Sequence, residues 1–198
     1  MTSASAPEAQ ATALPSTTDR YWMTLILRSI PALGAGLGVT FWQDHSTSIG
    51  LIAFGVLAAS TGLVQLAGAF TTMTAGTDRA ITVALGLISA AAGIVALISL
   101  GSSVATLLLI LTMWAVLTGG LELYLGVRNK RVGVARDWLS LGTLTLLAAL
   151  IFAIIAPDAG LTTGLLGGYA LLVGVFLAIA GMSLKWAGPD LQHRKVAA

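Results

Sequence analysis

Three strongly polar side chains stand inside stretches of sequence that are otherwise apolar: Arg28, Gln65 and Glu122. An arginine and a glutamate can form an ion pair, and a carboxyl group in apolar surroundings can also take up and release a proton. The two charges match in depth. Arg28 follows Trp22 by six residues and Glu122 precedes Arg128 by six, which is about 9 Å in each case along an α-helix. We therefore predict that Arg28, Gln65 and Glu122 form one polar cluster.

Three interpretations of this cluster are open. In the simplest, Arg28 and Glu122 neutralise each other and hold the fold together, because an unpaired charge within a membrane costs at least about 2.5 kcal/mol. In the second, the pair belongs to a path for protons or a substrate. In the third, Arg28 extends to the lipid headgroups and never meets Glu122.

Other kinds of chemistry find little support. The chain has no cysteine, which excludes disulfides, thiolate catalysis and Cys-ligated metal sites. No nucleophile–base pair can be proposed, so we expect no enzyme activity, no cofactor and no metal. Histidine side chains in general titrate near pH 6.5, so one reading of His45, between Asp44 and Ser46 in a short connector, is a sensor of external acid, but a single loop histidine is more simply a solvated one.

The elements that carry these residues are membrane spans. Hydrophobic residues make up 57% of the 198 residues and charged residues 9%, whereas a soluble domain carries about 25% charged residues. The mean hydropathy is +0.93. Six apolar stretches are each close to the roughly 20 residues that cross a bilayer as a helix. They run over residues 21–42, 49–71, 80–99, 104–126, 138–156 and 161–184.

The connectors alternate in charge, which predicts the topology. The 43–48, 101–103 and 157–160 connectors have no lysine or arginine, and nine of the ten bases lie in the other connectors and the tails. Bases favour the cytoplasmic side, so we expect both termini in the cytoplasm. Aromatic residues at the span ends, such as Trp42 and Trp138, fit interfacial belts, whereas Trp114 is expected to pack inside. Lipid headgroups, not nucleic acid, are the expected partners of the basic 128–136 loop.

Small residues recur every seven positions in the even-numbered spans, which places them on one stripe of each helix. Such stripes allow close helix packing in lipid. The glycines of these stripes are Gly55, Gly62, Gly119, Gly126, Gly160, Gly167, Gly174 and Gly181, and all of them except Gly160 are predicted to be helix-packing positions.

The stripes also reveal a repeat. Aligning Gly62, Gly119 and Gly174 gives offsets of 57 and 55 residues, and the same offsets align Gly36, Gly93 and Ala148. We predict an all-α fold of three tandem helical hairpins, residues 20–72, 79–127 and 137–186, in a pseudo-threefold bundle. Residues 1–19 and 187–198 are expected to be cytoplasmic tails. Gln65 and Glu122 then occupy equivalent positions, with Leu177 as the third.

The third hairpin carries the clearest family resemblance. Its Asp137-Trp138-Leu139 start, its Ala156-Pro157-Asp158 turn and its Leu165-Leu166-Gly167-Gly168 segment before Gly174 resemble the HdeD family of bacterial inner-membrane proteins. The resemblance spans about residues 20–186, although the first outer turn lacks the proline. It implies a six-span protein loosely linked to acid stress, with no established biochemical activity and no catalytic residues.

Three classes of function therefore remain open. The first is a non-enzymatic, HdeD-like membrane protein that supports membrane or acid-stress physiology. The second is an accessory structural subunit of a larger membrane complex or of an assembly with itself, because glycine stripes on every hairpin and little mass outside the membrane suit packing. The third is a small transporter or proton channel that uses Glu122 and Arg28.

Overall fold

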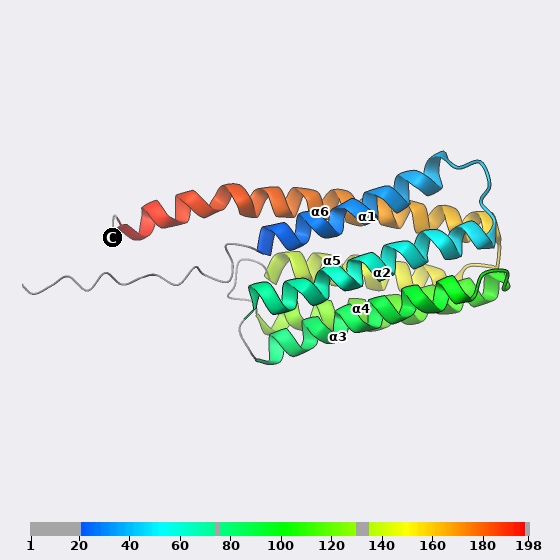
Figure 1. Ribbon diagram of the computed structural model, residues 1–198, viewed down its shortest axis with the longest axis horizontal. Coiled ribbons are helices and arrows are strands. Elements are labelled where there is room, and N and C mark those ends of the chain that lie inside the picture. Colours follow the sequence, from blue (N-terminus) through cyan, green and yellow to red (C-terminus); the bar gives the residue numbers. More distant parts are fainter. Residues whose placement is uncertain (1–20, 74–75, 130–134, 197–198) are drawn as a thin grey trace, which may run out of the picture.

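The computed structural model describes residues 21–73, 76–129 and 135–196, with side chains up to Trp186. It contains six α-helices over these residues (Figure 1), and all six are long and apolar enough to cross a membrane. They are α1 (Tyr21–Phe41), α2 (Thr47–Thr72), α3 (Thr77–Ile98), α4 (Val104–Arg128), α5 (Ala135–Ile154) and α6 (Ala159–Val196). The predicted all-α fold with six spans is confirmed, and the chain is a multi-pass membrane protein.

The helix bounds lie within a few residues of the predicted spans, except at the end of α6. That helix continues to Val196, beyond residue 186, and its segment Ala159–Trp186 is long and apolar enough to cross a membrane. Residues 1–19, predicted as a tail, and residues 130–134 of the basic loop lie outside the described residues.

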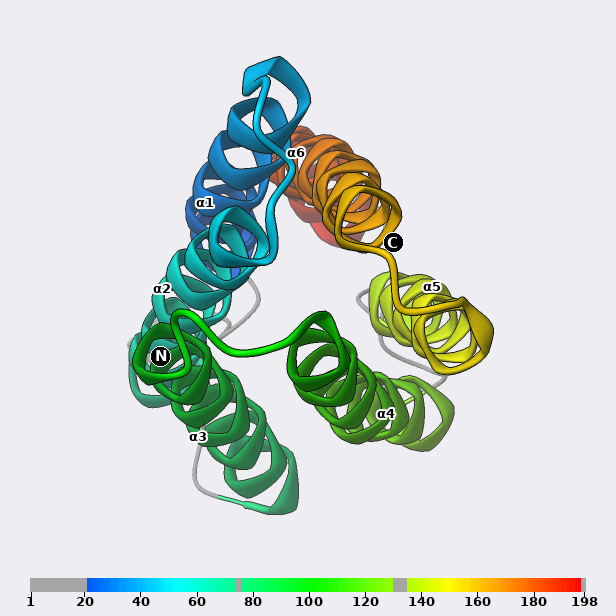
Figure 2. The same ribbon diagram turned by 90° about the vertical axis from the view of Figure 1, so that its right-hand side faces the viewer.

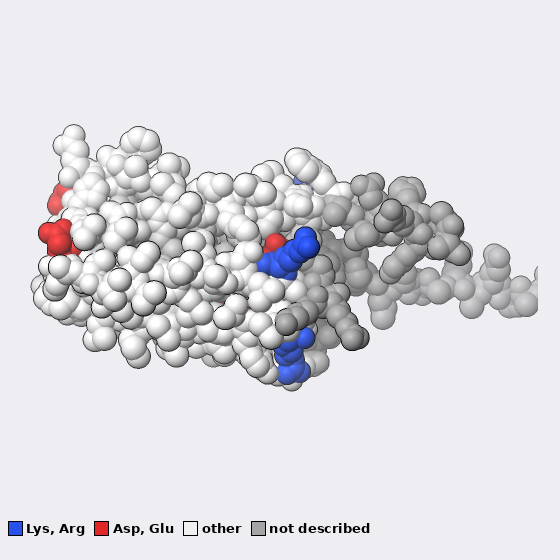
Figure 3. Space-filling view, turned by 180° about the vertical axis from the view of Figure 1, so that it is seen from behind, with Lys and Arg blue, Asp and Glu red and all other residues white. Residues whose placement is uncertain are grey.

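Charged side chains gather at the two ends of the bundle (Figure 3). Asp44 and Asp158 lie in the connectors at one end, which we name the acidic end. Arg79, Arg128 and Lys185 lie at the other end, which we name the basic end. The face between the two ends in Figure 3 is white, as expected of a surface that contacts lipid.

The six helices form three closely packed pairs, α2 with α3, α4 with α5 and α1 with α6. Each pair joins helices of different hairpins, and the α1–α6 pair closes the ring between the two ends of the chain. Figure 2, which looks along the bundle, shows the three pairs around a common axis. The two helices within a hairpin pack less extensively against each other than these pairs do.

Repeat-equivalent glycines stand at the centre of each pair. A Cβ atom added to Gly62 would lie 2.5 Å from the backbone N of Ala90, one on Gly119 would lie 3.1 Å from that of Leu146, and one on Gly174 would lie 2.9 Å from that of Leu33. The same geometry thus recurs three times between even and odd helices. A Cβ on Gly55, Gly126, Gly167 or Gly181 would also lie less than 3 Å from an odd helix. Gly160, at the start of α6, differs: among the described residues, a Cβ there would meet only Asp158 Oδ1, at 3.4 Å.

These contacts correct the predicted register of α5 by one residue. The facing residues Leu33, Ala90 and Leu146 are separated by 57 and 56 positions, not by 57 and 55. Ala149 therefore takes the place predicted for Ala148. From the second hairpin to the third, the odd helices are offset by 56 residues and the even helices by 55, because the connector from α5 to α6 is one residue shorter than that from α3 to α4. The seven-residue glycine spacing in the even helices carries no information on the register of α5.

Candidate functional site

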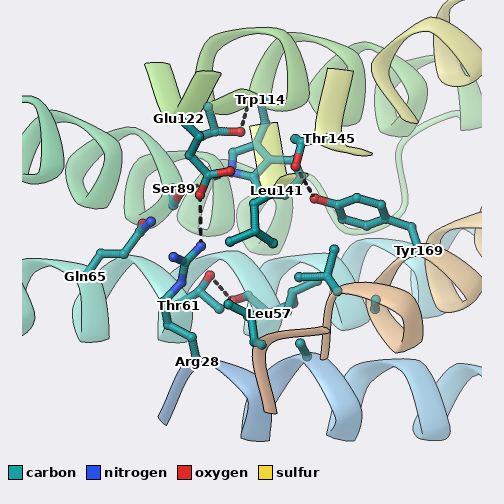
Figure 4. Close-up of a pocket in the computed structure, with 15 residues that line it drawn as sticks. Arg28, Leu57, Thr61, Gln65, Ser89, Trp114, Glu122, Leu141, Thr145 and Tyr169 are labelled. Carbon is teal, nitrogen blue, oxygen red and sulfur yellow. Dashed lines mark hydrogen bonds and ion pairs between the residues drawn. The ribbon is translucent and has the colours of Figure 1, made fainter. Parts of the chain in front are cut away.

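Arg28 of α1 and Glu122 of α4 form an ion pair in the half of the bundle near the basic end. Arg28 Nη2 donates to Glu122 Oε1 at 3.1 Å, and the two side chains are 12% and 6% exposed. The helices α1 and α4 are not among the closely packed pairs. The side chain of Arg28 therefore reaches across the bundle to meet Glu122 (Figure 4).

Gln65 of α2 lies beside this pair but is bonded to neither partner. Its side chain is 5% exposed, and its Oε1 has no hydrogen-bond partner among the described residues. Arg28 Nε is likewise buried and unpartnered among them. The three residues predicted as a polar cluster thus border one space, in which two polar atoms lack a protein partner.

That space is a cavity with about 30 Å³ open to the centres of water molecules. Gln65, Glu122 and Leu177, which the repeat aligns, all line it, so it lies where the three hairpins meet. Two further sets of equivalent residues line it nearer the acidic end. The first set is Thr61, Thr118 and Val173. The second set, one turn further, is Leu57, Trp114 and Tyr169. The odd helices contribute Ala32, Ser89 and Thr145, also repeat equivalents.

Two hydrogen bonds in the cavity wall are repeat equivalents of each other. Trp114 Nε1 donates to Ser89 Oγ at 3.2 Å, and the hydroxyls of Thr145 and Tyr169 lie 2.9 Å apart. Each joins the odd and even helices of one hairpin. In the first hairpin the same positions hold Ala32 and Leu57, which pack in a small apolar cluster. The cavity is therefore polar on two of its three sides at this level.

Sequence reasoning expected Trp114 to pack inside but missed the hydroxyls and Tyr169 of this wall. Serine and threonine within a helix usually bond to their own backbone, as Thr61 does to the Leu57 carbonyl at 2.6 Å and Thr118 to the Trp114 carbonyl at 2.7 Å. They therefore give no separate signal in the sequence. A signal was present in the repeat: Leu57, Trp114 and Tyr169 are separated by the offsets of 57 and 55 residues, so the three occupy equivalent positions.

The aromatic residues at the basic end behave differently from the expected belt. Trp138 and Tyr21 are buried, and Trp138 Nε1 donates to the Tyr21 hydroxyl at 2.8 Å. They close the bundle between α5 and α1. Trp42 and Trp186 are exposed, as belt residues are. Trp114 packs inside, edge-on to Phe54 and Tyr169.

The carboxylates of the acidic end support helix starts. Asp158 Oδ1 accepts from the Leu161 backbone N–H at 2.7 Å, at the start of α6. Asp44 accepts from the backbone and side chain of Ser46 at 2.9 and 3.1 Å, directly before α2. Both satisfy N–H and hydroxyl donors near an exposed turn. His45 lies in the same turn and is half-buried.

The bases of the basic end lie against aromatic or acidic neighbours. Arg79 covers the ring of Phe70 at 4.5 Å, and Lys185 covers that of Trp22 at 4.9 Å. Arg128 Nε lies 3.3 Å from Asp78 Oδ1, at an exposed position. Cations beside aromatic rings at span ends suit the level of lipid headgroups.

Comparison with protein families gives one result. A family described as a short repeat of unknown function, DUF308, matches residues 27–97 and again residues 84–154. The two matches begin 57 residues apart, the offset that separates Gly62 from Gly119, and together they extend from α1 to the end of α5. No curated protein and no solved structure matches the chain. Because the matches cover more than half of its length, the chain belongs to the DUF308 family of short repeats.

Proposed function

We propose that the chain is a non-enzymatic protein of the bacterial inner membrane that supports membrane or acid-stress physiology, as the HdeD family that it resembles is expected to do. The observation that carries the proposal is a ring of three repeated hairpins with one buried ion pair across its axis. Membership in the short-repeat family agrees with this architecture. In this proposal the pair's first role is to fix the bundle.

Survival in acid tests this function. The chain is expressed in a bacterial strain that lacks HdeD-like proteins, and survival after exposure to low external pH is counted. We expect a higher surviving fraction than with an empty vector. The matched control is the Gly62→Leu variant, whose added side chain would meet the backbone of α3 and which should give no protection. Equal survival with and without the chain, at verified membrane levels, would contradict the proposal.

The proposed topology places both termini in the cytoplasm. It is supported by Arg79, Arg128 and Lys185 at the end of the bundle at which α1 begins and α6 ends. A green fluorescent protein fused after Ala198 should fluoresce, because it folds in the cytoplasm. Alkaline phosphatase fused at the same position should be inactive. The opposite pair of results would reverse the topology.

A second candidate, a small transporter or proton channel, is favoured by the cavity beside the ion pair. Glu122 and Arg28 both border this space, and intramembrane ionisable groups often mark ion or proton pathways. Purified protein in sealed vesicles with an internal pH dye should then show proton flux that the Glu122→Gln variant loses. Flux equal to that of empty vesicles would exclude this candidate.

A further inference from the structure

The two unpartnered polar atoms beside the ion pair complement each other. Arg28 Nε carries a hydrogen-bond donor and Gln65 Oε1 is an acceptor, and both residues line the same cavity. A buried polar group without a partner costs roughly 1–3 kcal/mol. Buried water commonly supplies the missing partner, since one water molecule accepts one hydrogen bond and donates another.

The cavity has the room and the polar lining that bound water needs. A water molecule requires about 10–15 Å³ of space for its centre, and the cavity offers about 30 Å³. Its wall adds the hydroxyls of Ser89, Thr145 and Tyr169. An apolar cavity of this size would stay dry, but two residues of this wall, Arg28 and Gln65, carry buried polar atoms that have no partner among the described residues.

A second, smaller cavity of about 10 Å³ continues this space toward the basic end. It shares Arg28, Gln65 and Glu122 with the first cavity. It extends to residues at the ends of spans, among them Tyr21, the first residue of α1, and Met73, which directly follows α2. Thr24 and Thr82 add hydroxyls to its wall. The ion pair thus stands between two cavities in series.

Toward the acidic end the centre of the bundle is mostly apolar, although Thr162 and Thr163 near the start of α6 are also fully buried. Large side chains that are 0–1% exposed fill this part of the bundle: Leu51, Phe54, Leu107, Leu111 and Leu166, which we name the apolar layer. The distances along α4 are also unequal. Glu122 is six residues from Arg128 and eighteen from Val104, which is about 9 Å and about 27 Å of helix.

We propose that the two cavities form one hydrated inlet, which reaches Glu122 from the basic end and is closed by the apolar layer. Its ligand is water: one molecule accepts from Arg28 Nε and donates to Gln65 Oε1, and others solvate the Glu122 carboxylate. The inlet uses the same site as the second candidate function, but it requires no transport across the membrane. A negative flux assay therefore leaves it standing, and a dry cavity would not exclude the acid-stress role.

The composition of the chain allows water to be detected at Glu122 directly. Glu8 and Glu122 are its only glutamates, so in the Glu8→Gln variant labelled with ¹³C-glutamate and ¹³C-methyl leucine the glutamate carboxyl signal reports on Glu122 alone. In lipid bilayers, solid-state NMR should show fast magnetisation transfer from water to the Glu122 carboxyl carbon. The variant Thr24→Leu, which fills the smaller cavity through which water enters, should slow this transfer severalfold. A carboxyl signal that grows no faster than signals from leucine methyl groups of the bundle would overturn the proposal.

The direction of the inlet is tested with single cysteines, because the natural chain has none. The Thr24→Cys variant places a thiol in the smaller cavity, and the Leu111→Cys variant places one in the apolar layer. A small methanethiosulfonate reagent reacts with the thiolate, which needs water to form. We expect modification at position 24 to be about tenfold faster or more, on that principle. Equal rates, or faster reaction at position 111, would overturn the inlet.

Discussion

Arg28 has no charged counterpart in the other two repeats. With the register that the structure gives, its equivalents are Leu85 and Leu141, both buried. Glu122 in turn has Gln65 and Leu177 as equivalents, so each charge occurs once among three similar positions. The ion pair therefore breaks the threefold symmetry at the level where the cavity lies.

Removing one charge should harm the fold more than removing both. Either the Arg28→Leu or the Glu122→Leu substitution leaves a buried charge without its partner, which costs about 3–5 kcal/mol. The double variant places leucine at position 28, where both other repeats have it, and at position 122, where the third repeat has it, and should lose much less than the sum. The free energy of unfolding in detergent is measured for the unchanged protein, the two single variants and the double variant. The difference between the double variant's loss and the sum of the single losses gives the coupling energy of Arg28 and Glu122. Additive losses would mean that the two charges do not depend on each other.

The two equivalent hydrogen bonds of the cavity wall should contribute equally to stability. Trp114→Phe removes the donor to Ser89, and Tyr169→Phe removes the hydroxyl beside Thr145. Each should lower the free energy of unfolding by about 0.5–1.5 kcal/mol. The control is Trp186→Phe at a position that is 70% exposed, which should change it by less than about 0.5 kcal/mol. Thermal unfolding of the three variants measures the difference, and a neutral Tyr169→Phe variant would contradict it.

The sequence predicts the charged residues of the site better than its neutral ones. Arg28 and Glu122 are conspicuous because charges are rare and costly within a span, and their equal depth indicates a pair. Ser89 and Thr145 have no such signature, because a hydroxyl in a helix can bond to its own backbone and is therefore tolerated on any face. Tyr21 and Trp138 show the same limit, since an aromatic residue at a span end suits either lipid or the interior.

At the scale of helices, the glycine stripes predict a contact face but not the helix that covers it. A hairpin suggests that its own two helices pack most closely. The structure instead places the close contacts between hairpins, as in α2 with α3. Without a hydrophobic drive in lipid, the pairs that allow the closest backbone approach are favoured. Such complementarity depends on both surfaces and cannot be predicted from one stripe.

Two glycine-to-alanine substitutions separate packing from helix propensity. Gly62→Ala would place a methyl group 2.5 Å from the Ala90 backbone, so the α2–α3 pair must separate and the melting temperature should fall. Gly34→Ala in α1 adds a methyl group with no atom within 4 Å. Alanine favours helix over glycine by about 0.5–1 kcal/mol, so this control should be neutral or slightly stabilising. Similar melting temperatures for the two variants would show that Gly62 does not set the helix separation.

At the scale of the molecule, the three repeats close into a ring in which the first and third hairpins meet. The number and order of spans follow from hydropathy, and the repeat offsets predict threefold symmetry. The α1–α6 contact that completes the ring has no signal of its own, because no connector joins these helices. Its equivalence to the α2–α3 and α4–α5 contacts becomes visible only when the facing residues Leu33, Ala90 and Leu146 are compared.

A disulfide across the ring would test this closure. A Cβ atom on Gly50 of α2 would lie 3.6 Å from the Cβ of Thr163 in α6, within the distance that a disulfide spans. The Gly50→Cys, Thr163→Cys variant should therefore oxidise to an intramolecular disulfide, detected as a change in gel mobility of the monomer. The matched control pairs Gly50→Cys with Gly164→Cys, at a position with no atom within 4 Å, and should stay reduced. Equal yields would place α2 and α6 apart.

The α1–α6 contact has a consequence for the order of synthesis. Both helices of this pair have their chain-terminal ends at the basic end, where α2 joins α3 and α4 joins α5. Each helix therefore has a close partner, and the order of the helices around the ring is closed. Only the position of the two termini distinguishes the α1–α6 pair from the other two pairs. A permuted gene that begins at Thr77 and joins Val196 to Tyr21 by a linker would encode the same set of helix contacts. The starting point of translation is thus independent of the architecture that the repeats specify.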